Sequence, residues 1–219
     1  MPGTLHYFDA GGRAECIRSM LAHANFDYID LRLSAEQFGA KVMAGDYPLG
    51  SVPVWDEDGK MVPVTNVILR MLGIRLGYYS EDPMTMYAMD SLCDWIEDKG
   101  DAFYDYLMPI MMGSQMLEEG GDDWIEVYWN QLLPLVENRL AEHGAKFIAG
   151  TSRPTIADFR VFASLMSTVH FTDSPIPRSV LNKVEGRIAA HPHFARWRQA
   201  MLSECQPYLN TRKPTGYKI

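Results

Sequence analysis

Short strand-like and helix-like patterns of hydrophobic residues alternate along the first part of the chain, up to about residue 80. Residues 28–33 alternate strictly between apolar and polar positions, as in a strand with one buried face. Residues 13–24 place their apolar side chains three and four positions apart, as in a helix. Further short strands are predicted at 4–8, 52–55 and 61–64.

The order of these elements predicts a small mixed sheet with helices packed on it. Asp58-Gly59 lies between the last two strands and is a strong signal for a tight hairpin turn. A helix at 66–76 follows, with Thr65 before it as the expected N-cap. The predicted order is therefore β-α-β, a loop, then β-β-α, in which the first unit forms a parallel pair and the hairpin adds antiparallel strands.

Long helical patterns replace the alternating ones after a linker predicted at 77–82. The sequence thus predicts an α/β domain at 1–78 and an all-helical domain, a helical bundle, at 83–219. The helices expected in the second domain are one from Pro83 toward Met116 with a bend near Pro109, one at 122–143, one beginning at Thr155, and a last one that contains Phe194, Trp197 and Met201.

Composition narrows the classes of function. The chain has 219 residues, 47% of them hydrophobic, which is enough for one large domain or two small ones. No stretch approaches the ~20 apolar residues that span a bilayer, and no apolar signal-peptide core opens the chain, so a soluble intracellular protein is expected. A net charge of −8 without a basic stripe argues against nucleic acid and anionic membranes as partners.

The sulfur-containing residues point to a reducing compartment and an adaptable interior. Cys16, Cys93 and Cys205 are odd in number and far apart, which argues against a disulfide framework and against a metal site and fits the cytoplasm. Many of the 14 methionines fall between residues 84 and 116. Flexible methionines can line an apolar pocket, although they serve equally as filler in an ordinary helical core.

The run from Leu5 to Glu15 resembles the opening of the tyrosine-type cytosolic glutathione S-transferases, closest to the sigma class with the alpha and mu classes as neighbours. In that family a strand ends in Tyr-Phe and an Arg-Gly-Arg-Ala-Glu motif enters the first helix, whereas here Gly11 takes the place of the first arginine. The resemblance implies a thioredoxin-like domain that binds glutathione, a helical domain that completes a hydrophobic substrate site, a detoxification role, and a homodimer.

Tyr7 and Arg13 are the catalytic residues that the resemblance implies. A free thiol with a pKa near 8.5 is mostly protonated at neutral pH, and the thiolate is the nucleophile. A phenol at the end of a strand can donate its O–H to that sulfur, and an arginine adds positive potential. Lowering a thiol pKa by two units requires about 2.7 kcal/mol, which one or two charge-assisted hydrogen bonds can supply. The alternative for Tyr7 is an ordinary half-buried strand tyrosine.

The same resemblance implies the residues that hold glutathione. A cis Val52-Pro53 step would turn the Val52 backbone toward the cysteinyl part of the tripeptide. Thr65 and the start of its helix would bind the γ-glutamyl carboxylate, although Val64 replaces the glutamine usual before it. The remaining expected contacts are Phe38 in place of a tryptophan, Lys41 near the glycyl carboxylate, and Asp94 reaching the tripeptide in the other subunit, whereas Asp90 is expected to be a solvated acidic residue.

The helical domain supplies a folding motif and the expected substrate pocket. Gly150 with Thr155 and Asp158 matches the family's capping box, in which Asp158 bonds back to the Thr155 N-cap. An apolar electrophile is expected to contact Tyr104, Met108, Met111, Met112 and Tyr208.

Three other functions remain open from the sequence. A glutathione-dependent isomerase or peroxidase of the prostaglandin-synthase type would use the same tripeptide. A crystallin-like member would not be an enzyme, and the departures at Gly11 and Val64 keep that possibility open. A cysteine-type thiol transferase would need a reactive cysteine near Gly11, and Cys16 falls within the first helix instead.

Overall fold

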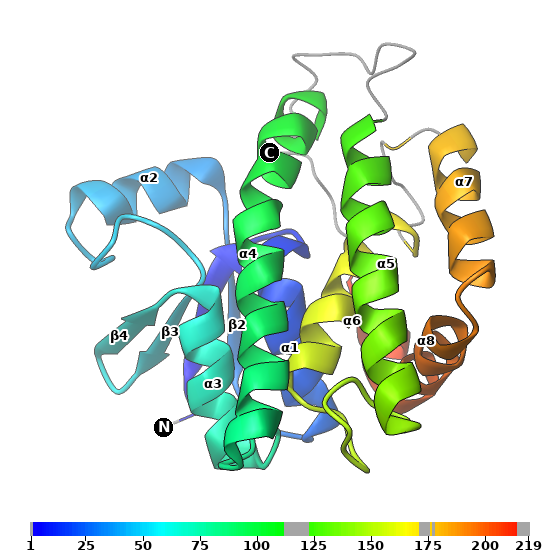
Figure 1. Cartoon of the computed structure of the whole chain (residues 1–219). Helices are drawn as coiled ribbons and strands as arrows, with labels where there is room; N and C mark the ends of the chain where they lie inside the picture. The colour runs from blue at the N-terminus through cyan, green and yellow to red at the C-terminus, as the bar shows by residue number, and fades with distance from the viewer. Residues whose placement is uncertain (1, 112–122, 171–175, 177, 214–219) are drawn as a thin grey trace.

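A computed structural model describes residues 2–111, 123–170, 176 and 178–213, excluding the side chains of 101–111 and 123–126. Its sheet has four strands in the order β2-β1-β3-β4 (Figure 1). The first pair is parallel, with Tyr7 opposite Arg32, and the other two pairs are antiparallel. The strands are β1 (Thr4–Phe8), β2 (Ile29–Leu33), β3 (Val54–Glu57) and β4 (Lys60–Pro63).

Helices occupy both faces of the sheet, and the regular elements of the described chain other than the four strands are helical (Figure 1). Those of the first part are the 3-10 turn η1 (Gly12–Ala14), α1 (Glu15–His23), α2 (Ala35–Met43) and α3 (Thr65–Leu76). Those of the second part are α4 (Pro83–Met111), α5 (Asp123–His143), α6 (Ile156–Thr168), α7 (Arg178–Ala189), α8 (Pro192–Glu204) and α9 (Gln206–Thr211).

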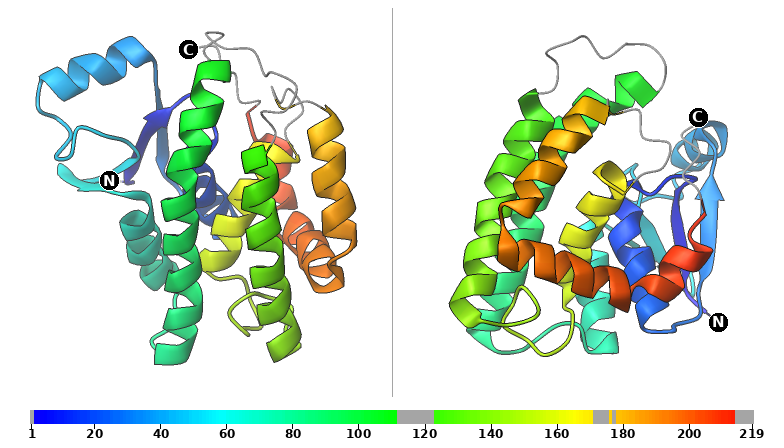
Figure 2. Two further views of the ribbon diagram at one scale, coloured as in Figure 1. Left: turned by 45° about the horizontal axis from the view of Figure 1, so that its top comes forward. Right: turned by 90° about the vertical axis from the view of Figure 1, so that its right-hand side faces the viewer.

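The main core is continuous across both parts. Helix α6 is buried along nearly its whole length and packs against α1 and α4. The buried cluster extends from Leu5 in β1 to Tyr208 in α9. Figure 2 shows α8 and α9 running along the edge of this core toward α1. A second, smaller cluster under α2 contains Leu33, Tyr47 and Val54.

The predicted sheet topology and hairpin are confirmed, and one helix of the first part was missed. Helix α2 occupies the segment predicted as a loop. No residue of α2 is fully buried. It begins at a capping box in which the Ser34 hydroxyl accepts from Gln37 N–H and the Gln37 side chain accepts from Ser34 N–H. The pair Ser34–Gln37 was the signal in the sequence.

The helical part also differs in detail from the prediction. Helix α4 begins at Pro83 as expected and is described to Met111, while its expected end near Met116 lies outside the described residues. Helices α7 and α9 were not predicted. In the part of the chain that is described, no helix combines the length and the apolar character needed to cross a membrane.

Candidate active site

The turn from β1 into η1 places Tyr7 against the backbone of Arg13. The Arg13 N–H donates to the Tyr7 hydroxyl over 3.1 Å, and the Tyr7 side chain is only 6% exposed. Gly12 lies between them with φ +45°, and a Cβ at this position would fall 2.5 Å from the Tyr7 hydroxyl oxygen. Only glycine has both the conformational freedom and the lack of a side chain that this close approach requires.

Burial determines the protonation of this phenol. It raises the pKa of Tyr7, and the Arg13 N–H bond only partly opposes that rise. The phenol is therefore neutral at physiological pH and carries a proton that it can donate. Among the described residues, the Tyr7 hydroxyl forms one hydrogen bond, which it accepts from Arg13 N–H. No described residue therefore accepts the phenolic proton.

Arg18 fixes the loop that follows Tyr7. It is almost completely buried, and it donates to the carbonyl oxygens of Ala10 and Phe8, to the latter over 3.4 Å. Its Nε also bonds Asp30 in β2 over 3.0 Å, and its guanidinium carbon lies 5.7 Å from the centre of the Tyr7 ring. Arg18 thus ties the end of β1 to β2 and to α1, and the sequence analysis did not identify this role.

Glu97 of α4 joins two arginines beside the turn. Its carboxylate accepts from Arg13 Nε over 2.9 Å and also from Arg160 Nη2 of α6. The side chain of Arg13 is therefore held toward α4 and α6. Arg13 therefore brings positive charge near Tyr7, but its ion pair with the Glu97 carboxylate partly neutralises that charge.

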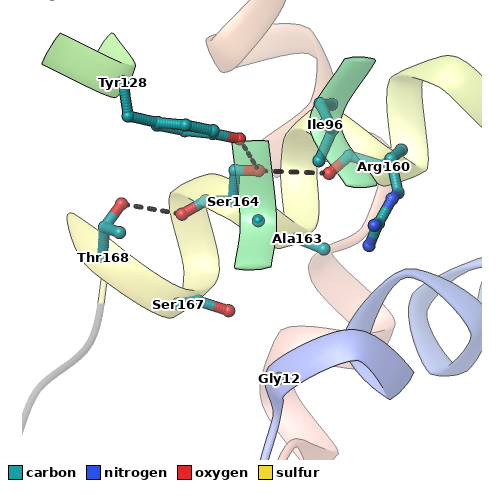
Figure 3. A pocket seen from close by; sticks show the side chains of 9 residues that line it. Gly12, Ile96, Tyr128, Arg160, Ala163, Ser164, Ser167 and Thr168 are labelled. Carbon is teal, nitrogen blue, oxygen red and sulfur yellow. Dashed lines mark hydrogen bonds between the residues drawn. The ribbon is translucent and has the colours of Figure 1, made fainter. Parts of the chain in front are cut away.

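A cavity opens beside this ion-pair group, between η1, α4, α5 and α6 (Figure 3). Gly12 forms the wall nearest Tyr7, and Arg160 lies at the Glu97 side. The remaining wall combines apolar groups of α4 and α6 with several hydroxyls. The residues that line the cavity are Gly12, Ile96, Gly100, Tyr128, Arg160, Ala163, Ser164, Ser167 and Thr168.

Phe38 and Lys41 lie on α2, as part of the small cluster beside the sheet. Phe38 packs edge-on against Phe8, with 5.0 Å between ring centres, and stacks with Tyr47 at 6.1 Å. Lys41 Nζ bonds Asp46 over 3.0 Å, and both side chains are partly exposed. Phe8 follows Tyr7 directly, so Phe38 is near the turn, whereas Lys41 is paired at the surface.

The Val52-Pro53 peptide is cis, as the resemblance implied.

The start of α3 differs from the prediction. Val64, with φ +76°, occupies the N-cap position, and Thr65 is the first helical residue. No side chain caps this helix, so the expected capping role of the Thr65 hydroxyl is wrong. The side chain of Thr65 is buried, and the first N–H groups of α3 lack partners within the helix.

Asp94 belongs to an ion-pair network between α3 and α4. Its carboxylate accepts from Asn66 over 2.7 Å and from Arg70 over 3.0 Å, and its side chain is 57% exposed. Arg70 also bonds Asp90 over 2.7 Å, and Asp90 accepts from the Tyr79 hydroxyl over 2.6 Å. Asp90 is therefore not the free solvated residue that was expected.

The predicted substrate residues are divided between described and undescribed parts of the chain. Tyr104, Met108 and Met111 lie on α4 beyond Gly100, where side chains are not described, and Met112 lies outside the described residues. Tyr208 is buried on α9 and does not line the cavity. Its pKa is raised mainly by burial and also by the nearby Glu15 carboxylate.

The sequence analysis missed the polar face of α6. Arg160, Ser164, Ser167 and Thr168 recur at helical spacing in a helix that is otherwise apolar and buried. That spacing is visible in the sequence, but the neighbours that this face meets are not. Within the described residues, no group of three or more histidine, cysteine or acidic side chains could hold a metal ion.

Comparison with known proteins identifies the family. Glutathione S-transferase 1 of Ascaris suum is 31% identical over 168 residues, which are 74% of this chain and 78% of that protein. S-crystallin 3 of Enteroctopus dofleini is 26% identical over 208 residues, which are 89% of this chain and 94% of that protein. No family model matches the chain.

Solved structures agree with this result at the level of the fold. The glutathione S-transferase of Ascaris lumbricoides superimposes with a TM-score of 0.79 at 22% identity, covering 99% of this chain and 100% of that one. The architecture is that of a thioredoxin-like part followed by a mostly helical part. The chain belongs to the glutathione S-transferase family.

Proposed function

We propose that this protein conjugates reduced glutathione to electrophiles through a thiolate that Tyr7 stabilises. The observation that carries the proposal is the Tyr7 hydroxyl, which accepts a hydrogen bond from Arg13 N–H and keeps its own proton available. A neutral phenol held in this way donates to the sulfur of a bound thiol and favours the thiolate. Arg13 aids this step through its backbone N–H and through the charge it shares with Glu97.

The remaining glutathione contacts follow the family resemblance. We propose that the Val52 backbone, set by the step to Pro53, pairs with the cysteinyl part of the tripeptide. The N-terminus of α3 at Thr65 would bind the γ-glutamyl carboxylate, since its first N–H groups can donate hydrogen bonds and the helix dipole favours an anion. Phe38 and Lys41 would lie at the glycyl end, where Lys41 would have to leave Asp46.

A cysteine mechanism is disfavoured by the surroundings of Cys16. Its side chain is completely buried, its thiol donates to the Arg13 carbonyl oxygen over 3.3 Å, and burial raises its pKa. A buried thiol with a raised pKa forms little thiolate and is out of reach of a substrate.

A non-enzymatic, crystallin-like role is the second candidate. The similarity to S-crystallin 3 over most of both chains favours it, as does Val64 in place of the usual glutamine. The two candidates differ in whether the protein binds and activates the tripeptide. Retention on immobilised glutathione, followed by measured conjugation of an aryl halide, separates them.

We also propose that the protein is a homodimer that forms through α3 and α4. Val67 and Ile74 of α3 and Tyr87 of α4 are exposed, and their helical spacing places them around the Arg70–Asp90 ion pair. Such a group of exposed apolar side chains marks an interaction surface. In this assembly Asp94 would lie near the glutathione of the partner subunit. Sedimentation velocity on the full chain measures the oligomeric state.

The domain limits at 1–78 and 83–219 and the cytoplasmic location are parts of the same proposal. The cytoplasm is a compartment in which glutathione and the three free cysteines remain reduced.

The substitution Tyr7→Phe tests the mechanism. We expect kcat/KM for an aryl halide to fall by about one to two orders of magnitude, because the pKa of the bound thiol rises toward its free value near 8.5. The pKa of the thiol in the complex is measured directly from the ultraviolet absorbance of the thiolate. Tyr28→Phe is the matched control, since it removes a phenolic hydroxyl beside the same sheet. Equal thiol pKa values in the two variants would refute the role of Tyr7.

A further inference from the structure

A second cavity lies between the loop that follows α5 and the beginning of α8, two helices that pack together (Figure 1). Its volume is about 310 Å³. That is near the lower limit for pockets that hold small organic molecules, and about ten times the volume that one molecule occupies in liquid water. None of its residues lines the cavity beside Tyr7. This basic cavity is lined by Gly144, Ala145, Lys146, His193, Arg196 and Trp197.

The wall of the basic cavity carries three basic residues and no acidic one. Lys146 belongs to the loop, whereas His193 and Arg196 lie one turn apart on α8. This is a local departure in a chain whose net charge is −8. Lys146 Nζ bonds Glu204 over 2.7 Å. An ammonium group has three N–H donors, so Lys146 can hold Glu204 and a second acceptor at the same time.

Arg196 retains capacity for an anion. Within the described part of the chain, its side chain forms no ion pair with a carboxylate, and its hydrogen bond runs from Nη2 to His193 Nδ1 over 2.8 Å. A guanidinium can only donate, so His193 Nδ1 is the acceptor and the neutral ring carries its proton on Nε2. Most N–H groups of Arg196 therefore have no described partner, and His193 supplies one more donor.

The N-terminus of α8 already holds a carboxylate of the protein. Glu137 of α5 accepts from the backbone N–H groups of His193 and Phe194, over 3.1 and 2.7 Å. Glu137 does not itself line the basic cavity. An anion in the basic cavity therefore depends on the side chains of its wall and not on the end of the helix.

Trp197 gives the basic cavity a rigid base. Its side chain is 1% exposed, and its ring nitrogen donates to Asp158 over 2.8 Å. Arg196 directly precedes Trp197 in α8, so the backbone that carries the guanidinium is held in place by this buried contact. A site whose framework is already ordered loses less free energy when a ligand binds.

We infer that the basic cavity binds a small phosphate monoester. A phosphate group carries about −1.5 to −2 charges at neutral pH and three strong acceptor oxygens, which suits two cations and an imidazole N–H better than a singly charged carboxylate does. The planar guanidinium of Arg196 can bind two phosphate oxygens at once, and the ammonium of Lys146 adds a point charge. The volume leaves room for the organic part of the ester. Binding of this kind does not require the conjugation proposed above.

Isothermal titration calorimetry on the full chain tests the inference. The titrants are glucose 6-phosphate, inorganic phosphate and glucose, at low ionic strength because salt screens charges at the surface. The proteins are the wild type, Arg196→Gln, Arg196→Lys and Lys60→Gln. Lys60→Gln is the matched control, since it removes one positive charge at an exposed position on β4. Circular dichroism establishes that each variant is folded.

We expect the wild type to bind glucose 6-phosphate, to bind inorganic phosphate more weakly, and not to bind glucose. Arg196→Gln should raise the Kd for glucose 6-phosphate roughly ten- to hundredfold, which is the effect of losing charge-assisted hydrogen bonds. Arg196→Lys should give a smaller rise, because it keeps the charge and loses the planar fork. Lys60→Gln should match the wild type.

Four results would overturn the inference. The first is a folded wild type that does not bind glucose 6-phosphate, and the second is an equal Kd for inorganic phosphate, which would mean that the cavity holds the ion alone. The third is the same Kd in Arg196→Gln and Lys60→Gln. The fourth is competition by saturating glutathione, which would place the phosphate at the glutathione site. Because calorimetry measures binding without conjugation, a failure to conjugate an aryl halide refutes the proposed function alone.

Discussion

Replacing Gly12 by alanine should damage both the stability and the chemistry of the protein. The residue has φ +45°, which costs a non-glycine residue roughly 1–2 kcal/mol. The new Cβ would also fall 2.5 Å from the Tyr7 hydroxyl oxygen, so either the ring or the turn must move. That movement breaks the 3.1 Å bond from Arg13 N–H, a loss of about 1 kcal/mol. We expect the free energy of unfolding to fall by about 2–3 kcal/mol in total.

Gly45→Ala is the control that separates the two contributions. Gly45 has φ +76°, but a Cβ there would meet no atom within 4 Å. Its substitution should therefore show only the conformational cost of roughly 1–2 kcal/mol. Urea denaturation at neutral pH measures the free energy of unfolding of both variants, and the difference between them reports the contact with Tyr7.

The chemical consequence is measured on the folded variants. With Tyr7 displaced, the bound thiol should approach its free pKa, and conjugation at a pH below that pKa should fall by about tenfold or more. Gly45→Ala should conjugate at the wild-type rate. If Gly12→Ala and Gly45→Ala share the same stability and the same thiol pKa, the close approach of the turn to Tyr7 does not constrain residue 12 and the reasoning is wrong.

Two further predictions concern buried charge and pH. Glu15→Gln breaks the ion pair with Arg212, in which the Glu15 side chain is 2% and the Arg212 side chain 13% exposed, and it should lower the free energy of unfolding in urea by about 3 kcal/mol. Glu57→Gln breaks the more exposed pair with Arg75 and should lower the free energy of unfolding by less than about 1 kcal/mol. Similar losses in the two variants would contradict this prediction. Burial lowers the pKa of His6 and of His170 from the ordinary 6.5. On acidification these two histidines therefore take up protons at a higher pH in the unfolded chain than in the folded one, and the free energy of unfolding should decline as the pH falls below about 6.5. His6→Asn should flatten the profile of unfolding free energy between pH 7 and 5, and an unchanged slope would exclude His6 as a contributor.

The capping box of α6 shows what the sequence could predict. Thr155 and Asp158 are three positions apart, and their local contacts follow from that spacing alone. The structure confirms them, with Thr155 N–H donating to Asp158 over 2.8 Å. The same carboxylate also accepts from Ile148 N–H and from the Trp197 ring nitrogen. These partners are distant in the sequence, and no local pattern indicates them.

The start of α3 and the cavity show why the rest escaped prediction. A positive φ is rare for a β-branched residue, so Val64 was not a candidate for the N-cap, and Thr65 was assigned there on preference alone. The hydroxyl at Ser167 is visible in the sequence as one member of a polar face. What α4, α5 and η1 place opposite this face is a property of tertiary packing.

The packing of α1 against α6 has a consequence for unfolding. Ile17, Met20 and Leu21 of α1 are buried in the same cluster as Phe159 and Phe162 of α6. Neither the sheet part nor the helical part can therefore separate without exposing the apolar interior of the other. We expect the two parts to melt as one cooperative unit, so that the turn carrying Tyr7 stays ordered for as long as α6 does.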